Sequence, residues 1–208
     1  MQTQKITMLP ELSKTIENIR NQPVSNERKE VLKPLIAYIQ SKVDQNKDIN
    51  LNFICTHNSR RSQFSQIWAQ TAANYYGIPT RCFSGGVEVT AFNERAVESI
   101  KKSGFKVTSE GKTNPTYYVF YSDGQEPICT FSKLFDDPIN REDDFAAVMT
   151  CSHADENCPF IPGAEKRIPV LYEDPKAFDN TPEEAARYDE RSLQIASEMF
   201  YVFSQIKS

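Results

Sequence analysis

The sequence has no apolar stretch that approaches the ~20 residues needed to cross a bilayer. It also has no run of basic residues, and its formal net charge is -4, which argues against nucleic acid or an anionic membrane as a partner. The segment Met1 to Arg20 lacks the continuous hydrophobic core of a secretory signal. No internal repeat or low-complexity segment is present. A cytoplasmic protein is therefore expected, with the bacterial periplasm as the less favoured alternative.

A full set of structural disulfides is excluded too, because the chain has five cysteines. In an ordinary soluble chain such cysteines stay reduced unless they take part in redox chemistry. At 208 residues, with 39% hydrophobic and 25% charged residues, the chain suits one domain, or one domain with an appendage. Because the net charge is negative, an anion-binding site would be a small positively charged spot rather than an extended basic surface, and such a spot fits a small substrate.

The most informative stretch is Cys55-Thr56-His57-Asn58-Ser59-Arg60-Arg61-Ser62. It follows the apolar run 51–54 and precedes a helical pattern, so its backbone N–H groups and the positive end of the helix can hold a tetrahedral oxyanion. Arg61 offers a planar fork for two oxygens of phosphate or arsenate. The same positive field favours the thiolate of Cys55, which is the nucleophilic form. The plain alternative is a buried, inert cysteine beside a solvated arginine pair.

Residues 1–48 predict a helical extension that precedes a catalytic domain over 49–208. Two apolar stripes support it, one in each helix: Leu12, Ile16 and Ile19, then Val31, Leu35, Ile39 and Val43. Pro34 either begins the main body of the second helix or kinks it. The extension is interpreted as a cap packed on the main domain, with a dimerisation or regulatory arm as the alternative.

From Ile49 the pattern alternates between strands and helices, which predicts a three-layer α/β sandwich around a central four-stranded parallel sheet. The expected strands are 49–54, 80–84, 145–150 and 167–172, and a closing helix is expected over 183–206. Segments 116–121 and 128–131 predict an inserted β-hairpin, whose aromatic residues are interpreted as packing rather than as a substrate rim. The anion loop and the ends of the third and fourth strands should converge at the carboxyl edge of the sheet.

Two further cysteines, Cys151 and Cys158, bracket a polar segment after the third strand, and this segment is expected to be mobile. If Cys151 reaches Cys55, thiol–disulfide exchange can carry two electrons from the buried nucleophile to an exposed pair. Three alternatives remain open. Zinc could bind Cys151, His153 and Cys158, although closed sites use four ligands at tighter spacing. The cysteines could also be inert, or they could form a redox switch that protects a phosphatase.

A candidate general acid, Asp174, stands before Pro175 at the end of the fourth predicted strand. A carboxylic acid there could protonate a departing oxygen, and the following proline keeps the aspartate extended. Asp137 before Pro138 is the rival, but it lies in a linker rather than at the ligand edge of the sheet.

Together these residues resemble the low-molecular-weight protein tyrosine phosphatase superfamily, and most closely its thioredoxin-coupled arsenate reductases. The resemblance covers about 49–206, and the motifs that carry it are Cys55-Thr56, Asn58-Ser59, Arg61-Ser62-Gln63, Ser84-Gly85-Gly86-Val87-Glu88, Cys151 through Cys158-Pro159, and Asp174-Pro175. The anion loop and the Asp-Pro pair are common to both branches. The pair Cys151 and Cys158 is typical of the reductases.

The resemblance implies that Cys55 attacks arsenate held by the loop and Arg61, while Asp174 protonates the leaving oxygen. Ser62 would steady the thiolate, and Asn58 would hold the loop in shape. Cys151 would then form a disulfide with Cys55, and Cys158 would resolve it, leaving a disulfide for a thioredoxin-like reductant. Neither a cofactor nor a metal is expected.

This chain departs from the family at three positions. His57 replaces a usual glycine and Arg60 a usual cysteine, and both side chains are expected to face solvent rather than to add positive potential to the loop. Gln66 stands where related reductases often carry a glutamate that helps bind potassium, so that ion is not predicted.

Arsenate reduction is the leading functional hypothesis. The alternative is a phosphomonoesterase that uses Cys55, Arg61 and Asp174, with phosphotyrosine as a candidate substrate. A third hypothesis is that the protein is an oxyanion or redox sensor that signals to a partner through the helical extension. A loop alone discriminates poorly between arsenate and phosphate, because the two are near isosteres.

Overall fold

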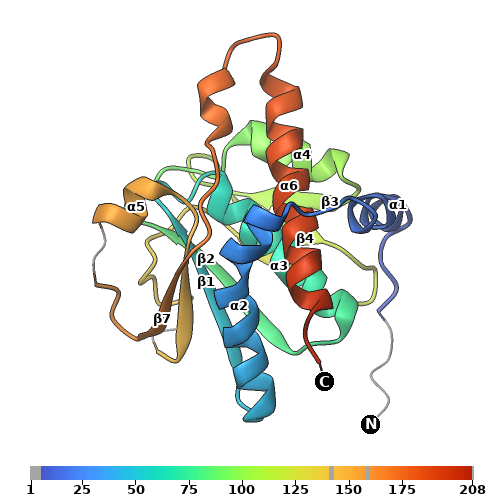
Figure 1. Cartoon of the computed structure of the whole chain (residues 1–208). Coiled ribbons are helices and arrows are strands. Elements are labelled where there is room, and N and C mark those ends of the chain that lie inside the picture. The colour runs from blue at the N-terminus through green and yellow to red at the C-terminus, as the bar shows by residue number, and fades with distance from the viewer. Residues whose placement is uncertain (1–5, 141–142, 158–159, 208) are drawn as a thin grey trace.

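A twisted parallel sheet of four strands forms the centre of the molecule (Figure 1). The computed structural model describes residues 6–140, 143–157 and 160–207. The strand order is β2-β1-β6-β7 and all neighbours are parallel, with β1 at Ile49–Cys55, β2 at Thr80–Gly86, β6 at Phe145–Met149 and β7 at Ala164–Pro169. Every residue of β1 and β6 is buried, as expected for central strands covered on both faces. The predicted α/β class with a four-stranded parallel sheet is confirmed.

The two faces of the sheet are covered unequally. Leu51 and Phe53 of β1 join a large apolar core with side chains from five helices, which are α1 (Pro10–Arg20), α2 (Asn26–Asp44), α3 (Arg61–Tyr76), α4 (Glu94–Lys102) and α6 (Glu184–Ser204). The other face carries a small cluster that includes Ile54 and Cys55 together with Ala154 of the short helix α5 (Ser152–Asn157). Figure 1 shows α5 apart from the other helices, beside the sheet. Cys55, at the end of β1, therefore lies on the face of the sheet that carries the smaller cluster and α5.

Helices α1 and α2 pack into the same core as the sheet. The stripe Leu12, Ile16 and Ile19 is buried, as are Leu35 and Ile39 of α2. Pro34 does not begin the main body of α2, because Ser25 accepts a hydrogen bond from the backbone N–H of Arg28 and starts the helix at Asn26. The division of the chain at residue 48 into extension and catalytic domain stays a prediction.

A second, antiparallel sheet contains the predicted hairpin. Its order is β3-β4-β5, with β3 at Lys106–Glu110, β4 at Thr116–Phe120 and β5 at Ile128–Thr130. Val119, Ile128 and Tyr121 are buried in the large core, which agrees with a packing role for this segment. Strand β3 was not predicted from the sequence, because its side chains are exposed except for the half-buried Val107 and so show no clear alternation.

Two sequence-based expectations around the third and fourth strands need correction. The fourth strand is Ala164–Pro169 rather than 167–172, since pairing with β6 begins at Ala164, directly after Gly163 with φ 76°. Beyond it, the backbone N–H groups of Val170 and Tyr172 still donate to Met149 and Thr150. Residues 152–157, expected as a mobile loop, form α5.

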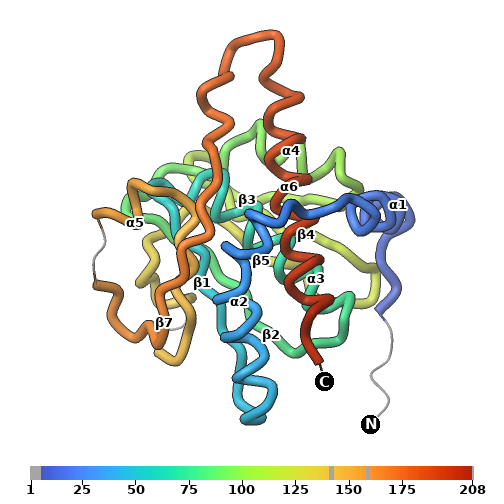
Figure 2. Tube along the Cα trace, viewed as in Figure 1, coloured from blue at the N-terminus to red at the C-terminus, as the bar shows by residue number. Residues whose placement is uncertain are grey.

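Asp174 lies on a long connection between β7 and α6. Figure 2 traces this connection as it rises along one side of the molecule and returns as α6. The short 3-10 helix η1 (Pro175–Phe178) follows Asp174, whose carboxylate accepts a hydrogen bond from the N–H of Lys176. Among the described residues, no helix has the length and apolar character needed to traverse a lipid bilayer.

Candidate active site

The loop from Cys55 to Arg61 joins the end of β1 to the start of α3, as the sequence predicts. Cys55 is 3% exposed and lies beside Gly86 of β2 in the sheet register. Asn58 has φ 45°, a left-handed conformation that asparagine tolerates better than most residues with a side chain. Loop N–H groups and the N-terminal end of α3 thus lie at the carboxyl edge of the sheet, a position that can stabilise an anion.

Cys55, Ser62 and Asn58 form a connected hydrogen-bond chain. Cys55 Sγ lies 3.1 Å from Ser62 Oγ, and Asn58 Nδ2 donates to that same oxygen at 2.8 Å. The orientation of the Asn58 amide is settled by Lys133, whose backbone N–H donates to Asn58 Oδ1 at 3.0 Å. The hydroxyl hydrogen of Ser62 is then free to point at the sulfur, where it can stabilise negative charge.

Gly86 permits the close approach of the loop to the end of β2. A Cβ atom there would lie 2.7 Å from the backbone nitrogen of Asn58 and 2.9 Å from the carbonyl oxygen of Thr56. That carbonyl accepts hydrogen bonds from the N–H groups of Val87 and Glu88, both at 2.8 Å. Only glycine fits at this contact, so the Gly85-Gly86 pair of the sequence motif positions the loop.

Arg61 and Asp174 lie together, although 113 positions separate them in the chain. Arg61 Nη2 donates to Asp174 Oδ2 at 2.6 Å, and its Nη1 donates to the carbonyl oxygen of Tyr172 at 3.1 Å. The two side chains are 14% and 31% exposed. Asp137, the rival acid, instead accepts a hydrogen bond from the N–H of Ile139 within its own turn.

Cys151 follows β6, the neighbour of β1, and is 1% exposed. Its sulfur lies 3.5 Å from Thr56 Oγ1, and it belongs to the same small apolar cluster as Cys55. His153 also reaches Thr56 Oγ1, at 3.3 Å from Nδ1. Cys55 and Cys151 are both free thiols. Cys158 lies outside the described residues.

Arg60 contradicts the expectation that it faces solvent. Its Nε donates to Tyr188 Oη at 2.8 Å, and its guanidinium lies 3.7 Å from the carboxylate of Asp179, with the side chain 11% exposed. The start of α6 and the end of η1 supply these partners, which no local pattern around the loop could indicate. His57 is more open, and its Nε2 lies 3.2 Å from Glu88 Oε2 with the side chain 40% exposed.

The remaining loop residues tie its backbone to the neighbouring segments. Ser59 Oγ donates to the carbonyl oxygen of Ala91 at 2.6 Å. The carbonyl oxygen of His57 accepts from Ser132 Oγ at 2.9 Å. Ser132 and Lys133, which hold this loop, were not identified from the sequence because nothing in the segment after β5 marks them. Among the described residues, no group of three or more His, Cys, Asp or Glu side chains could hold a metal ion.

Known arsenate reductases resemble this chain in sequence. An arsenate reductase of Staphylococcus saprophyticus is 30% identical over 123 residues, which are 59% of this chain and 76% of that protein. The chain belongs to the arsenate reductase and low-molecular-weight phosphatase superfamily. An arsenate reductase of Bacillus subtilis is 27% identical over 139 residues, or 67% of this chain and 83% of that protein. No family model matches the sequence.

The fold of the superfamily is seen in a low-molecular-weight protein tyrosine phosphatase from T. tengcongensis. That structure superposes with a TM-score of 0.50 and 16% sequence identity, over 76% of this chain and 100% of the phosphatase. At this identity the likeness concerns the fold. The superfamily comprises enzymes, so the loop, Arg61 and Asp174 are candidate parts of an active site.

Proposed function

We propose that this protein reduces arsenate to arsenite, with Cys55 as nucleophile and Cys151 as the second thiol. The observation that carries the proposal is the placement of two buried free thiols after adjacent strands, with Cys151 in contact with Thr56, the residue that follows Cys55. The names of the relatives support the substrate. A phosphatase needs only the first of these thiols.

In the first step the Cys55 thiolate attacks arsenic(V), and one oxygen leaves as water with a proton from Asp174. Asp174 and the fork of Arg61 are paired in the described structure, so substrate binding requires this pair to loosen. Arg61 would then bind two substrate oxygens, and the loop N–H groups would bind the others.

In the second step the Cys151 thiolate attacks the Cys55 sulfur. The sulfur–arsenic electron pair passes to arsenic, which leaves as arsenite(III), and a Cys55–Cys151 disulfide forms. Cys158 would attack Cys151 and free Cys55, and a thioredoxin-like dithiol would reduce the Cys151–Cys158 disulfide. Two electrons reach arsenic, and two thiols become one disulfide.

The test is thioredoxin-dependent arsenite production by wild type, Cys151→Ser and Cys158→Ser. Turnover should be lost in both variants. Cys129→Ser is the matched control, because Cys129 is a partly exposed free cysteine on β5 outside the loop. Full turnover by Cys158→Ser would contradict the proposed cascade, and full turnover by Cys151→Ser would exclude Cys151 as the second thiol.

The second candidate is hydrolysis of a phosphate monoester. A cavity of about 420 Å³ beside Arg61 and Asp174 favours it, because such a space exceeds what arsenate alone would fill. Arg28 of α2 and Arg191 of α6 also line this cavity. Hydrolysis of p-nitrophenyl phosphate that persists in Cys151→Ser, without any arsenate reduction by wild type, would decide for this candidate.

A further inference from the structure

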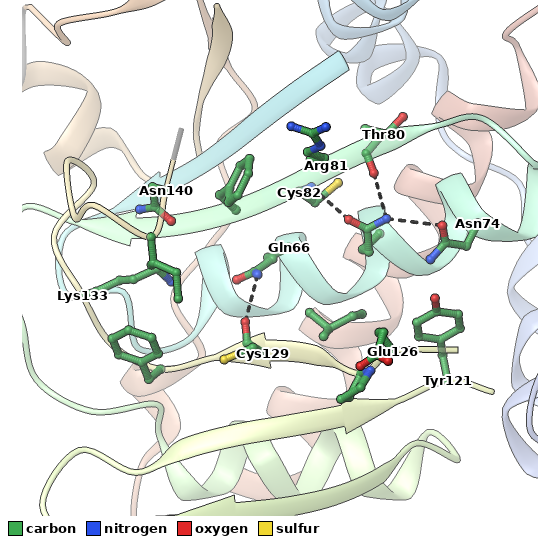
Figure 3. A pocket seen from close by; sticks show the side chains of 16 residues that line it. Gln66, Asn74, Thr80, Arg81, Cys82, Tyr121, Glu126, Cys129, Lys133 and Asn140 are labelled. Carbon is green, nitrogen blue, oxygen red and sulfur yellow. Dashed lines mark hydrogen bonds between the residues drawn. The ribbon is translucent and has the colours of Figure 1, made fainter. Parts of the chain in front are cut away.

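A second cavity, of about 430 Å³, is drawn in Figure 3. It is bounded by α3, by β2 at the edge of the parallel sheet and by β5 at the edge of the antiparallel sheet. The loop from Cys55 to Arg61 does not line it. Figure 3 shows Lys133 and Asn140 at one end of this cavity and Tyr121 and Glu126 at the other.

Glutamines of α3 hold the walls apart in a fixed geometry. Gln70 accepts from the N–H of Cys82 and donates to the carbonyl oxygen of Thr80, both at 2.9 Å. Gln66 accepts from Ser84 Oγ at 2.6 Å and donates to the carbonyl oxygen of Cys129 at 3.4 Å. Both β2 and β5 are therefore hydrogen-bonded to α3, so the cavity is preformed.

Lys133 is the unusual residue of this cavity. It is 4% exposed, and none of the salt bridges within 4.0 Å in the described ranges involves its ammonium group. Nζ lies 4.8 Å from the centre of the Phe131 ring, a contact that suits a cation. Burial lowers its pKa to about 8, although Asp137 and Cys129 oppose this shift. An ammonium group buried without a carboxylate partner costs stability, so it needs another explanation.

Asn140 adds an unpaired acceptor at the same end. Its Nδ2 donates to the carbonyl oxygen of Leu134, the residue after Lys133, at 3.3 Å and to that of Ser84 at 3.1 Å. Its Oδ1 is buried, and no donor among the described residues forms a hydrogen bond with it. A cation and a free acceptor thus occur together, while Phe83, Ile128 and Phe131 provide apolar walls.

We propose that this cavity binds a small 2-hydroxy carboxylate with an aromatic or branched apolar tail. The carboxylate would pair with Lys133, the neighbouring hydroxyl would donate to Asn140 Oδ1, and the tail would lie against Phe83, Ile128 and Phe131. This ligand differs from the tetrahedral oxyanion of the loop, so the proposal stands whichever reaction the loop catalyses.

Calorimetric titration of the full chain with 3-phenyllactate tests the proposal. Wild type should bind it, and Lys133→Met should weaken binding at least tenfold. Lys106→Met is the matched control, because Lys106 also lies over a phenylalanine ring, Phe120 at 5.9 Å, but is exposed. This control should bind as wild type does, and thermal melting should show that both variants are folded.

Two analogues separate the contacts. In 3-phenylpropionate the hydroxyl is missing, and we expect about fivefold weaker binding, equivalent to about 1 kcal/mol for one hydrogen bond. The neutral 3-phenyllactamide should bind at least tenfold more weakly than the acid. Absence of binding to wild type, equal binding to Lys133→Met, or displacement of 3-phenyllactate by inorganic phosphate would each overturn the proposal.

Discussion

The loop from Cys55 to Arg61 and the cavity bounded by α3, β2 and β5 differ in how their buried positive charges are compensated. In the loop, Arg61 pairs with Asp174 and Arg60 lies beside Asp179. In the cavity, Lys133 lies over the ring of Phe131, and in the described part of the chain it forms no salt bridge within 4.0 Å, although Asp137 acts on it from farther away. Compensated arginines can be held ready for an anion at little cost to the fold, whereas an uncompensated lysine lowers stability until something binds it. The arginines of the loop are thus neutralised by carboxylates of the protein itself, whereas Lys133 would be neutralised by the carboxylate of the proposed ligand.

The largest effect should come from replacing the nucleophile. Cys55→Ser should abolish arsenate reduction and phosphate-ester hydrolysis, with a loss of ~10³-fold or more, because a serine hydroxyl is not ionised in this setting. Initial rates of both reactions would measure the loss, and Cys129→Ser provides the control. Retention of either activity above one tenth of wild type would remove Cys55 from the mechanism.

The two adjacent arginines should differ sharply. Arg61→Lys loses the planar fork and should lower kcat/KM about 10²-fold. Arg60→Lys should lower it less than about threefold, since Arg60 faces Tyr188 and Asp179 rather than the substrate. Steady-state kinetics with arsenate or p-nitrophenyl phosphate would measure both. Equal losses would mean that Arg60 also binds the oxyanion.

Lys133→Met should stabilise the protein by on the order of 2 to 3 kcal/mol at pH 7. The pKa of Lys133 is about 8 in the folded state against 10.5 for the ordinary side chain, so below pH 8 both states carry the proton and the full penalty is present. Between pH 8 and 10.5 the unfolded state binds more protons, and the stability of wild type rises relative to the variant.

Urea unfolding of wild type and Lys133→Met at pH 7 and pH 10 would measure this gain. It should shrink at the higher pH. A variant less stable than wild type, or a gain independent of pH, would show that Lys133 is compensated by its surroundings.

The smallest effect is expected at His57. His57→Gln should change the free energy of unfolding by less than about 0.5 kcal/mol, because the pair with Glu88 is exposed on both sides. Chemical denaturation at pH 6 would measure it. A loss above about 1 kcal/mol would mean that this pair restrains the loop.

The sequence predicted the parts of the site that depend on short-range pattern. The end of β1, the loop and the start of α3 follow from an apolar run, a polar turn and a helical period. The meeting of Arg61 with Asp174 also followed, because parallel strands bring their carboxyl ends to one edge. Strand β3 and the true bounds of β7 did not, since an exposed strand and an irregular strand start leave little periodic signal.

Local sequence was thus enough for the strand–loop–helix unit and for the positions of Cys55 and Arg61 at its two ends. Contacts between distant segments decided that Arg60 turns to Tyr188, that Cys151 lies beside Thr56 and that Lys133 is buried against Phe131. Periodicity and capping depend on a few neighbouring residues, whereas burial and pairing of a long charged side chain depend on which distant surfaces pack around it.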